Sequence, residues 1–136
     1  MVDHVLPAKR SLIMAAVRSE DTGPEVAVRR IVYRLGYRYR LHVRSLPGHP
    51  DLVLPPLRKV IFVHGCFWHR HPRCRYATSP KTRRGFWQAK FACNVVRDRI
   101  VRRQLRRMDW KVLTVWQCEL KKPDRLTIRL NEFLSN

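Results

Sequence analysis

Apolar side chains recur with the three-to-four-residue spacing of helices in four segments of the chain. The clearest start signal is Thr22, which matches a capping box with Glu25 three residues later, and Gly36 ends the pattern that follows. This cap gives Glu25 a complete structural explanation, although a catalytic role is open as well. We predict helices over residues 11–18, about 24–35, about 85–108 and 123–134.

Four other segments have the pattern of strands. Residues 37–43 alternate between apolar and polar, and the apolar run at 60–63 indicates a strand buried on both faces. We expect an α/β fold in which helices flank a mixed sheet, in one domain spanning residues 1–136. The predicted strands cover residues 37–43, 51–54, 58–63 and 111–116.

Apolar and basic residues separate onto different faces of the predicted helix over residues 85–108. Val96, Ile100, Leu105 and Met108 are expected to face the core. Six arginines are expected to lie outside, where they form either an ordinary solvated face or part of a DNA-binding surface. They are Arg97, Arg99, Arg102, Arg103, Arg106 and Arg107.

The chain has a formal net charge of +19 and a sequence pI of about 11.3. Such a charge concerns partners rather than fold, and it favours nucleic acid, because neutralising phosphates releases counterions. A ribosomal-type or merely cationic surface is the alternative. The polar start and the lack of a long apolar run predict a cytoplasmic protein.

Three cysteines and one histidine form a candidate zinc site. Cys66, His71 and Cys74 lie in one short loop, and Cys118 follows the last predicted strand. Thiolates select zinc over magnesium, and three thiolates with one imidazole make a closed structural site. The remaining cysteine, Cys93, falls within a helical pattern, where we expect a buried free thiol.

One carboxylate and two histidines form a candidate site for phosphodiester hydrolysis. This reaction requires a metal to polarise the phosphate and a base to activate water. Asp51 is a natural magnesium ligand, and a backbone carbonyl near Val63 could complete the coordination. His64 or His69 could act as the base, and His69 is favoured because it lies in the loop. An ordinary strand-start role is the alternative for Asp51.

Four motifs stand out in the chain as a whole: Pro-Gly-x-Pro-Asp at 47–51, Val-Ile-Phe-Val-His-Gly-Cys-Phe-Trp-His at 60–69, Asn-Val-x-Arg-Asp-Arg at 94–99, and Trp-x-Val-Leu-x-Val-Trp-x-Cys at 110–118. Together they resemble the very-short-patch repair endonucleases, which are bacterial enzymes that nick DNA at T:G mismatches. The resemblance covers nearly the whole chain, and its His-Gly-Cys-Phe-Trp-His string is highly specific.

The resemblance implies a restriction-endonuclease-like fold and a magnesium-dependent nick 5′ to the thymine that arises when 5-methylcytosine deaminates. It implies that Asp51 binds the magnesium and that His64 and His69 act in catalysis with support from Glu25. The acidic-x-lysine pair of the wider superfamily is missing after Asp51, so the histidines would replace that lysine. The implied zinc ligands are Cys66, His71, Cys74 and Cys118.

The resemblance also implies how the protein would contact DNA. Phe67, Trp68 and Trp87 would form a wedge in the major groove, and residues 1–20 would approach the minor-groove side through Met14 and Val17. A mismatched pair is easier to unstack than a matched one, so inserted aromatic side chains would exploit that weakness. Packing over the zinc loop is the alternative for Phe67 and Trp68, and core packing is the alternative for Trp87.

We therefore expect a monomeric, nucleoid-associated bacterial endonuclease that nicks duplex DNA at T:G mismatches, with mismatch-repair proteins as further partners. Two other functions stay open. The chain could be a zinc-stabilised basic protein that binds DNA without cleaving it, or it could be another nuclease of the restriction type.

Overall fold

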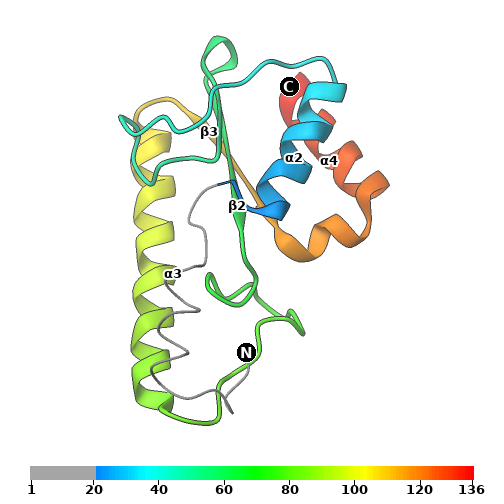
Figure 1. The fold of residues 1–136 in the computed structure, drawn as a ribbon. Helices are drawn as coiled ribbons and strands as arrows, with labels where there is room; N and C mark the ends of the chain where they lie inside the picture. Colours follow the sequence, from blue (N-terminus) through cyan, green and yellow to red (C-terminus); the bar gives the residue numbers. More distant parts are fainter. Residues whose placement is uncertain (1–20) are drawn as a thin grey trace.

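A computed structural model of the protein describes residues 21–136 (Figure 1). The helix predicted over residues 11–18 lies outside the described residues, as do Met14 and Val17. The described elements, in chain order, are α2 (Gly23–Arg34), β1 (Leu52–Leu54), the 3₁₀ helix η1 (Pro55–Leu57), β2 (Lys59–His64), α3 (Arg84–Arg107), β3 (Lys111–Trp116), the 3₁₀ helix η2 (Gln117–Lys121) and α4 (Pro123–Ser135).

The first described helix, α2, begins at the predicted capping box. The Glu25 backbone N–H donates to the Thr22 hydroxyl at 3.4 Å, and the Thr22 backbone N–H donates to the Glu25 carboxylate at 3.0 Å. Two backbone donors that the helix itself leaves unpaired are thereby satisfied. Gly36, with a φ of 96°, follows the last turn in the left-handed conformation that ends many helices.

The three strands form one mixed sheet in the order β1-β2-β3. β1 runs antiparallel to β2, with Leu52 opposite Ile61, whereas β2 and β3 are parallel, with His64 opposite Trp116. A parallel pair requires a crossover connection, which α3 supplies. The central strand β2 is buried at every position except Val63, which confirms the burial predicted from its apolar run.

The prediction of a strand over residues 37–43 is wrong. Only Arg40 pairs there, through an isolated antiparallel bridge to Val53. His42 has a φ of 56°, so the backbone leaves the extended conformation at that point. The alternating pattern reflected burial and not strand pairing, because its apolar residues pack against the core from an irregular segment: Tyr37, Tyr39 and Leu41.

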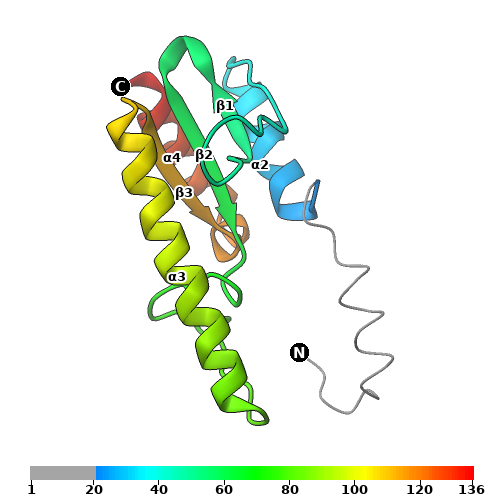
Figure 2. The same cartoon turned by 90° about the vertical axis from the view of Figure 1, so that its left-hand side faces the viewer.

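Helices cover both faces of the sheet. Figures 1 and 2 show α3 along one face and the pair α2 and α4 against the other. No helix among residues 21–136 has the length and apolarity needed to cross a membrane. The core on the α2 and α4 side contains Val28, Val32, Leu52, Leu54, Ile61, Val115, Leu126, Leu130 and Leu134; the core on the α3 side contains Val53, Val60, Phe62, Leu105 and Trp110.

Of the four α3 residues predicted to face inward, only Leu105 is buried. Val96 and Ile100 are about half exposed, and Met108 is 42% exposed. The inner face of α3 instead includes two polar residues, Asn94 and Asp98, which line a cleft beside the end of β2. Because these polar residues occupy inward positions, the hydrophobic pattern of the helix indicated the wrong face.

Candidate active site and metal centre

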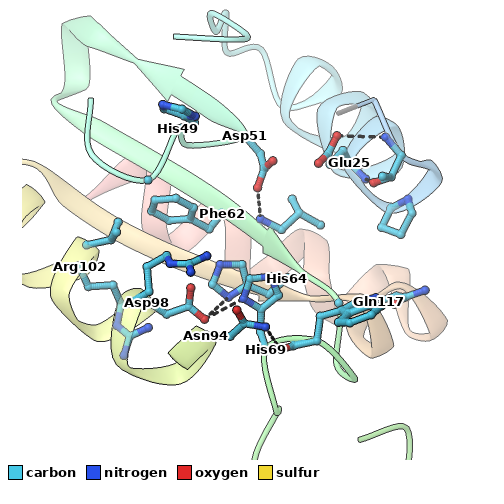
Figure 3. Close-up of a pocket in the computed structure, with 18 residues that line it drawn as sticks. Glu25, His49, Asp51, Phe62, His64, His69, Asn94, Asp98, Arg102 and Gln117 are labelled. Atoms are coloured by element: carbon cyan, nitrogen blue, oxygen red, sulfur yellow. Dashed lines mark hydrogen bonds and ion pairs between the residues drawn. The ribbon is translucent and has the colours of Figure 1, made fainter. Parts of the chain in front are cut away.

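A cleft of about 560 Å³ opens between the start of α2, the end of β2 and the middle of α3. Its walls bring together Glu25, Asp51, His64 and His69, which the sequence singled out from three separate segments (Figure 3). Val63 lines the same cleft. The proposed hydrolytic residues therefore share one site in the folded chain.

Asp51 lies just before β1, where its carboxylate reaches across to β2. The Val63 backbone N–H donates to it at 2.6 Å. The expectation that a carbonyl near Val63 completes the metal coordination stays a prediction. Burial and the neighbouring Glu25 carboxyl together raise the pKa of Asp51 to about 8, against the opposing effect of the Val63 hydrogen bond. A bound divalent cation would relieve this penalty, and buried carboxylate oxygens are ligands that magnesium prefers.

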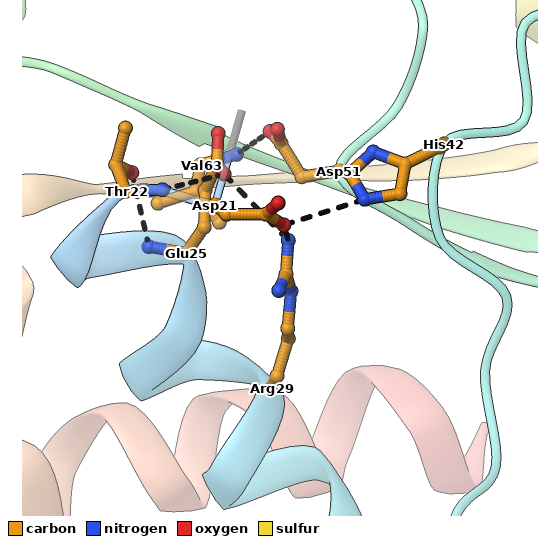
Figure 4. Close-up of polar contacts among 7 residues, drawn as sticks. All are labelled: Asp21, Thr22, Glu25, Arg29, His42, Asp51 and Val63. Atoms are coloured by element: carbon orange, nitrogen blue, oxygen red, sulfur yellow. Dashed lines mark hydrogen bonds and ion pairs between the residues drawn. The ribbon is translucent and has the colours of Figure 1, made fainter. Parts of the chain in front are cut away.

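Glu25 is held in place by the helix cap and by a cationic neighbour. Its side chain is buried, with the Arg29 guanidinium 3.7 Å away, and Arg29 also pairs with Asp21 at 2.7 Å (Figure 4). The capping role of Glu25 and its position beside Asp51 coexist, because one carboxylate serves both. The N-terminus of α2 thus fixes an acidic group at the cleft.

The two histidines lie face to face. The His64 and His69 rings are parallel, with centroids 3.8 Å apart. His69 Nδ1 lies 2.7 Å from the Asp98 carboxylate, whereas His64 Nδ1 lies 3.9 Å from the same group and has no hydrogen-bond partner among the described residues. The ligand atoms of His64, His69 and Asp98 all lie within 4.8 Å of one another, a spacing that a metal ion could bridge. The lone pairs in the planes of stacked rings run parallel and do not converge on one point, which favours hydrogen bonding over metal binding here.

The histidines differ in their environments. Burial and the neighbouring His69 lower the pKa of His64 to about 4, so His64 is neutral at neutral pH. The His69 side chain is 30% exposed, against 8% for His64. A carboxylate that accepts from Nδ1–H leaves Nε2 of a neutral imidazole as an acceptor. His69 therefore has the geometry of an oriented general base.

Asp98 and Asn94 are site residues to which the sequence reading gave no role. Asp98 holds His69, and the Asn94 amide donates to the Trp68 carbonyl at 3.0 Å. A signal for Asp98 was present in the sequence, because it is the sole acidic residue of α3 in a run rich in arginine. Predicting that it meets His69 required the helix orientation, which the apolar pattern had misplaced.

The loop before Asp51 is pressed against α3. Gly48 has a φ of 74°, and a Cβ at this position would lie 2.4 Å from a methyl carbon of Val101. Only glycine meets both conditions without a shift in the backbone or the helix. This close approach holds the loop that leads into β1 against α3, shortly before Asp51.

The four predicted zinc ligands come together at the ends of the two parallel strands. Cys66 and Cys118 each follow by two residues the paired positions His64 and Trp116, so strand pairing alone brings these cysteines to one edge. Their ligand atoms and those of His71 and Cys74 all lie within 4.8 Å of one another. Cys93 is outside the group, and it is exposed on α3 rather than buried as expected.

The chemistry of this group fits a bound cation. Burial and the adjacent Cys66 together raise the pKa of the Cys118 thiol to about 12. Burial likewise raises the pKa of Cys66. The pKa of Cys74 is instead lowered, against the effect of burial, by hydrogen bonds from the Tyr76 backbone and from the neighbouring cysteines. Cys66 and Cys118 therefore resist ionisation unless a bound cation compensates their charge, and thiolates are the ligands that structural zinc prefers. Cys66, His71, Cys74 and Cys118 thus form a candidate metal centre.

The three aromatic residues assigned to a DNA wedge gather beside the metal centre. Ring centroids are 5.1 Å apart for Phe67 and Trp68, and 5.8 Å apart for Trp68 and Trp87. Phe67 also packs edge-on against Phe91, which is buried on α3. Packing and surface presentation therefore coexist: Phe91 anchors the group, and Phe67, Trp68 and Trp87 remain partly exposed.

The chain resembles known proteins along nearly its whole length. A family model described as DNA mismatch endonuclease Vsr matches residues 2–75. The chain belongs to the Vsr family. It is 46% identical over 134 residues to the type II nicking enzyme V.XorIIP of Xanthomonas oryzae pv. oryzae, covering 98% of each chain.

Two other Vsr-family relatives show similar coverage. The DNA mismatch endonuclease Vsr of Escherichia coli is 42% identical over 127 residues, which are 93% of this chain and 81% of the relative. The type II nicking enzyme V.NmeAIP of Neisseria meningitidis is 38% identical over 134 residues, covering 98% of this chain and 95% of the relative. The Vsr-family likeness therefore extends across both the cleft and the metal centre.

Proposed function

We propose that this protein is a magnesium-dependent endonuclease that nicks one strand of duplex DNA, 5′ to the thymine of a T:G mismatch. The observation that carries the proposal is the shared cleft, in which the half-buried Asp51 carboxyl and the His69–Asp98 pair line one cavity. Membership of the Vsr family and the nicking and mismatch-endonuclease activities for which its relatives are named support a nicking endonuclease. The net charge of +19 suits a polyanionic substrate.

The residues take the following roles in the proposed reaction. Magnesium held by Asp51 and the Val63 backbone would supply Lewis-acid polarisation of the scissile phosphate. His69 Nε2 accepts a proton from the attacking water as the water oxygen bonds to phosphorus. The bond from phosphorus to the leaving sugar oxygen breaks at the same time, and that oxygen takes a proton from solvent water. Asp98 holds the imidazole in the tautomer that can accept this proton, and the neutral His64 supports the ring by stacking.

Mismatch selection is proposed to reside in the aromatic group beside the metal centre. Zinc held by Cys66, His71, Cys74 and Cys118 would fix the loop that carries Phe67 and Trp68, and preorganised aromatics lose little freedom when they enter a base stack. Unstacking is easier at a T:G pair than at T:A. We further propose that the mixed sheet belongs to a restriction-endonuclease-like fold, since the half-buried Asp51 carboxyl just before β1 and the cleft at the end of β2 suit such a nuclease.

A matched substrate panel tests the proposal. Three end-labelled duplexes would differ at one position only, as T:G, T:A or C:G, and each would be incubated with the protein and magnesium. We expect a single nick 5′ to the thymine in the T:G duplex and little cleavage of the other two. Equal cleavage of all three would indicate a restriction-type nuclease, and tight binding without cleavage would indicate a DNA-binding protein.

A further inference from the structure

Five arginines form a second, strongly cationic feature on α3, next to the active-site cleft. Their side chains line a groove of about 340 Å³. The sole acidic residue of the helix, Asp98, is engaged with His69, and none of the five makes an ion pair with the described part of the chain. We call this feature the arginine groove; it comprises Arg99, Arg102, Arg103, Arg106 and Arg107.

The spacing of these arginines places them on one stripe of the helix. Positions 99, 103 and 106 follow one another at four and three residues, and 102 and 106 are four apart. Like charges at this spacing destabilise a helix by a few tenths of a kcal/mol per pair, roughly. The helix dipole favours basic residues only in the last turn, which accounts for Arg106 and Arg107 alone. The rest of the stripe therefore calls for an anionic partner.

The arginine groove adjoins the active-site cleft. Arg102 lines both cavities, and Asp98, which holds His69, lies one helical turn before it. From Asp98 to Arg107 the helix rises about 13 Å, at roughly 1.5 Å per residue. Successive phosphates of one DNA strand advance by about 3.4 Å along the duplex, so this length corresponds to about four nucleotides.

We propose that the arginine groove binds backbone phosphates of the duplex on one flank of the cleavage site, within about four nucleotides of the scissile phosphate. Guanidinium groups hold phosphate oxygens in bidentate pairs, so arginine suits this role better than lysine. The contact is independent of base sequence and fixes the register of the cleft on the DNA. This proposal depends on the proposed function in one respect only, which is that the partner is duplex DNA lying across the cleft.

The salt dependence of DNA binding tests this proposal. The triple variant Arg99→Gln, Arg103→Gln, Arg106→Gln removes three exposed groove residues and leaves Arg102 at the cleft intact. The matched control, Arg30→Gln, Arg34→Gln, Arg125→Gln, removes the same charge from exposed positions on α2 and α4, across the sheet from α3 (Figure 2). Equal thermal stability of the three proteins would verify that folding is preserved.

Affinity for a fully paired duplex would be measured across a salt series without added magnesium. Each lost phosphate contact lowers the slope of log K against log salt by about 0.9. We expect the groove variant to lose about 2 to 3 units of slope and the control less than about 1. Equal slopes for the two variants would overturn the proposal.

Replacing single DNA phosphates with uncharged methylphosphonates would show which phosphates the arginine groove contacts. Methylphosphonates would be placed one at a time around the T:G site, and the wild type should lose affinity at a cluster on one flank, whereas the groove variant should not. The same loss in both proteins would also overturn the proposal. If the wild type shows this cluster but nicks none of the duplexes, the proposed function is refuted and the arginine groove is still supported as a phosphate-binding site. If the wild type nicks normally but the groove variant keeps the wild-type slope of log K against log salt, the arginine groove is refuted and the proposed function is still supported.

Discussion

The Nδ1 atom of His69 lies 2.7 Å from Oδ2 of Asp98, which links the loop after β2 to the middle of α3. The two residues are 29 positions apart, and only the crossover of α3 over the sheet brings them together. Because Asp98 is the sole acid on its helix, this contact orients the imidazole without a competing carboxylate on α3. The pair is the part of the cleft best suited to take a proton from water.

The first prediction concerns this pair. Asp98→Asn should keep the shape of the side chain but lose the fixed imidazole tautomer, so the single-turnover nicking rate should fall toward that of His69→Ala, by about 10²- to 10⁴-fold. Mismatch binding should be nearly unchanged. His64→Ala, which removes the buried stacking partner, should lose less than His69→Ala. Full loss in His64→Ala with near-normal turnover in His69→Ala would reverse the assigned roles.

The second prediction follows from the raised pKa of Asp51. The pKa of the Asp51 carboxyl is about 8 in the folded protein, against 3.8 for an unperturbed aspartate in an unfolded chain. The contribution of Asp51 to stability is therefore fully present below the unfolded value and is lost as pH rises through the folded value. Without magnesium, the Tm of Asp51→Asn relative to wild type should rise between pH 5 and 8.

Magnesium provides the control for this pH effect. At pH 8 the added ion should raise the Tm of the wild type and leave that of Asp51→Asn unchanged, because the ion requires an ionised carboxylate. His64 is common to both proteins, so its titration cancels in the comparison. A Tm difference that stays constant with pH would show that Asp51 is ionised throughout the range.

The third prediction concerns the four-residue metal centre. Cys118→Ser should lose bound zinc and thermal stability together, because a structural zinc site contributes directly to folding. Cys93→Ser, at an exposed position outside the group, should retain the metal and the Tm. Elemental analysis of the purified proteins measures the first quantity and thermal denaturation the second. Wild-type protein purified without zinc would contradict the assignment.

The fourth prediction concerns Phe67 and Trp68. The double variant Phe67→Ala, Trp68→Ala should bind T:G and T:A duplexes almost equally, with affinity maintained largely by charge and with steep salt dependence. Phe86→Ala, at the exposed edge of the same aromatic group, is the control and should keep the preference. A competition titration on two duplexes that differ at one pair measures it. An unchanged preference in the double variant would show that the aromatics only pack.

Much of the fold and the membership of the metal group could be predicted from local patterns. The Thr22 capping box and the apolar β2 run depend on neighbouring residues, and both are confirmed. Cys66, His71 and Cys74 were predictable as a group because they share a loop. Placing Cys118 with them depended on expecting the parallel strand ends to meet at one edge.

The errors arose where tertiary contacts override local pattern. Residues 37–43 alternate as a strand does, yet they pack on the core without a ladder partner beyond Arg40. On α3 the polar residues Asn94 and Asp98 occupy the inner face. The spacing of apolar residues therefore wrongly predicted that Val96 and Ile100 face the core, whereas both are exposed. A helix that lines a functional cleft turns polar side chains toward the protein interior. The spacing of its apolar residues then predicts the wrong inner face.

The central claim is that Asp51 serves the chemistry of a T:G nick and not the binding of DNA. The most direct measurement compares Asp51→Ala with the wild type on one T:G duplex, recording magnesium-dependent nicking and equilibrium binding in the same buffer. The account predicts that nicking is abolished while affinity for the mismatch is largely retained, because the arginines and aromatics supply that affinity. A variant that nicks at the wild-type rate would remove Asp51 from the active site and contradict the account.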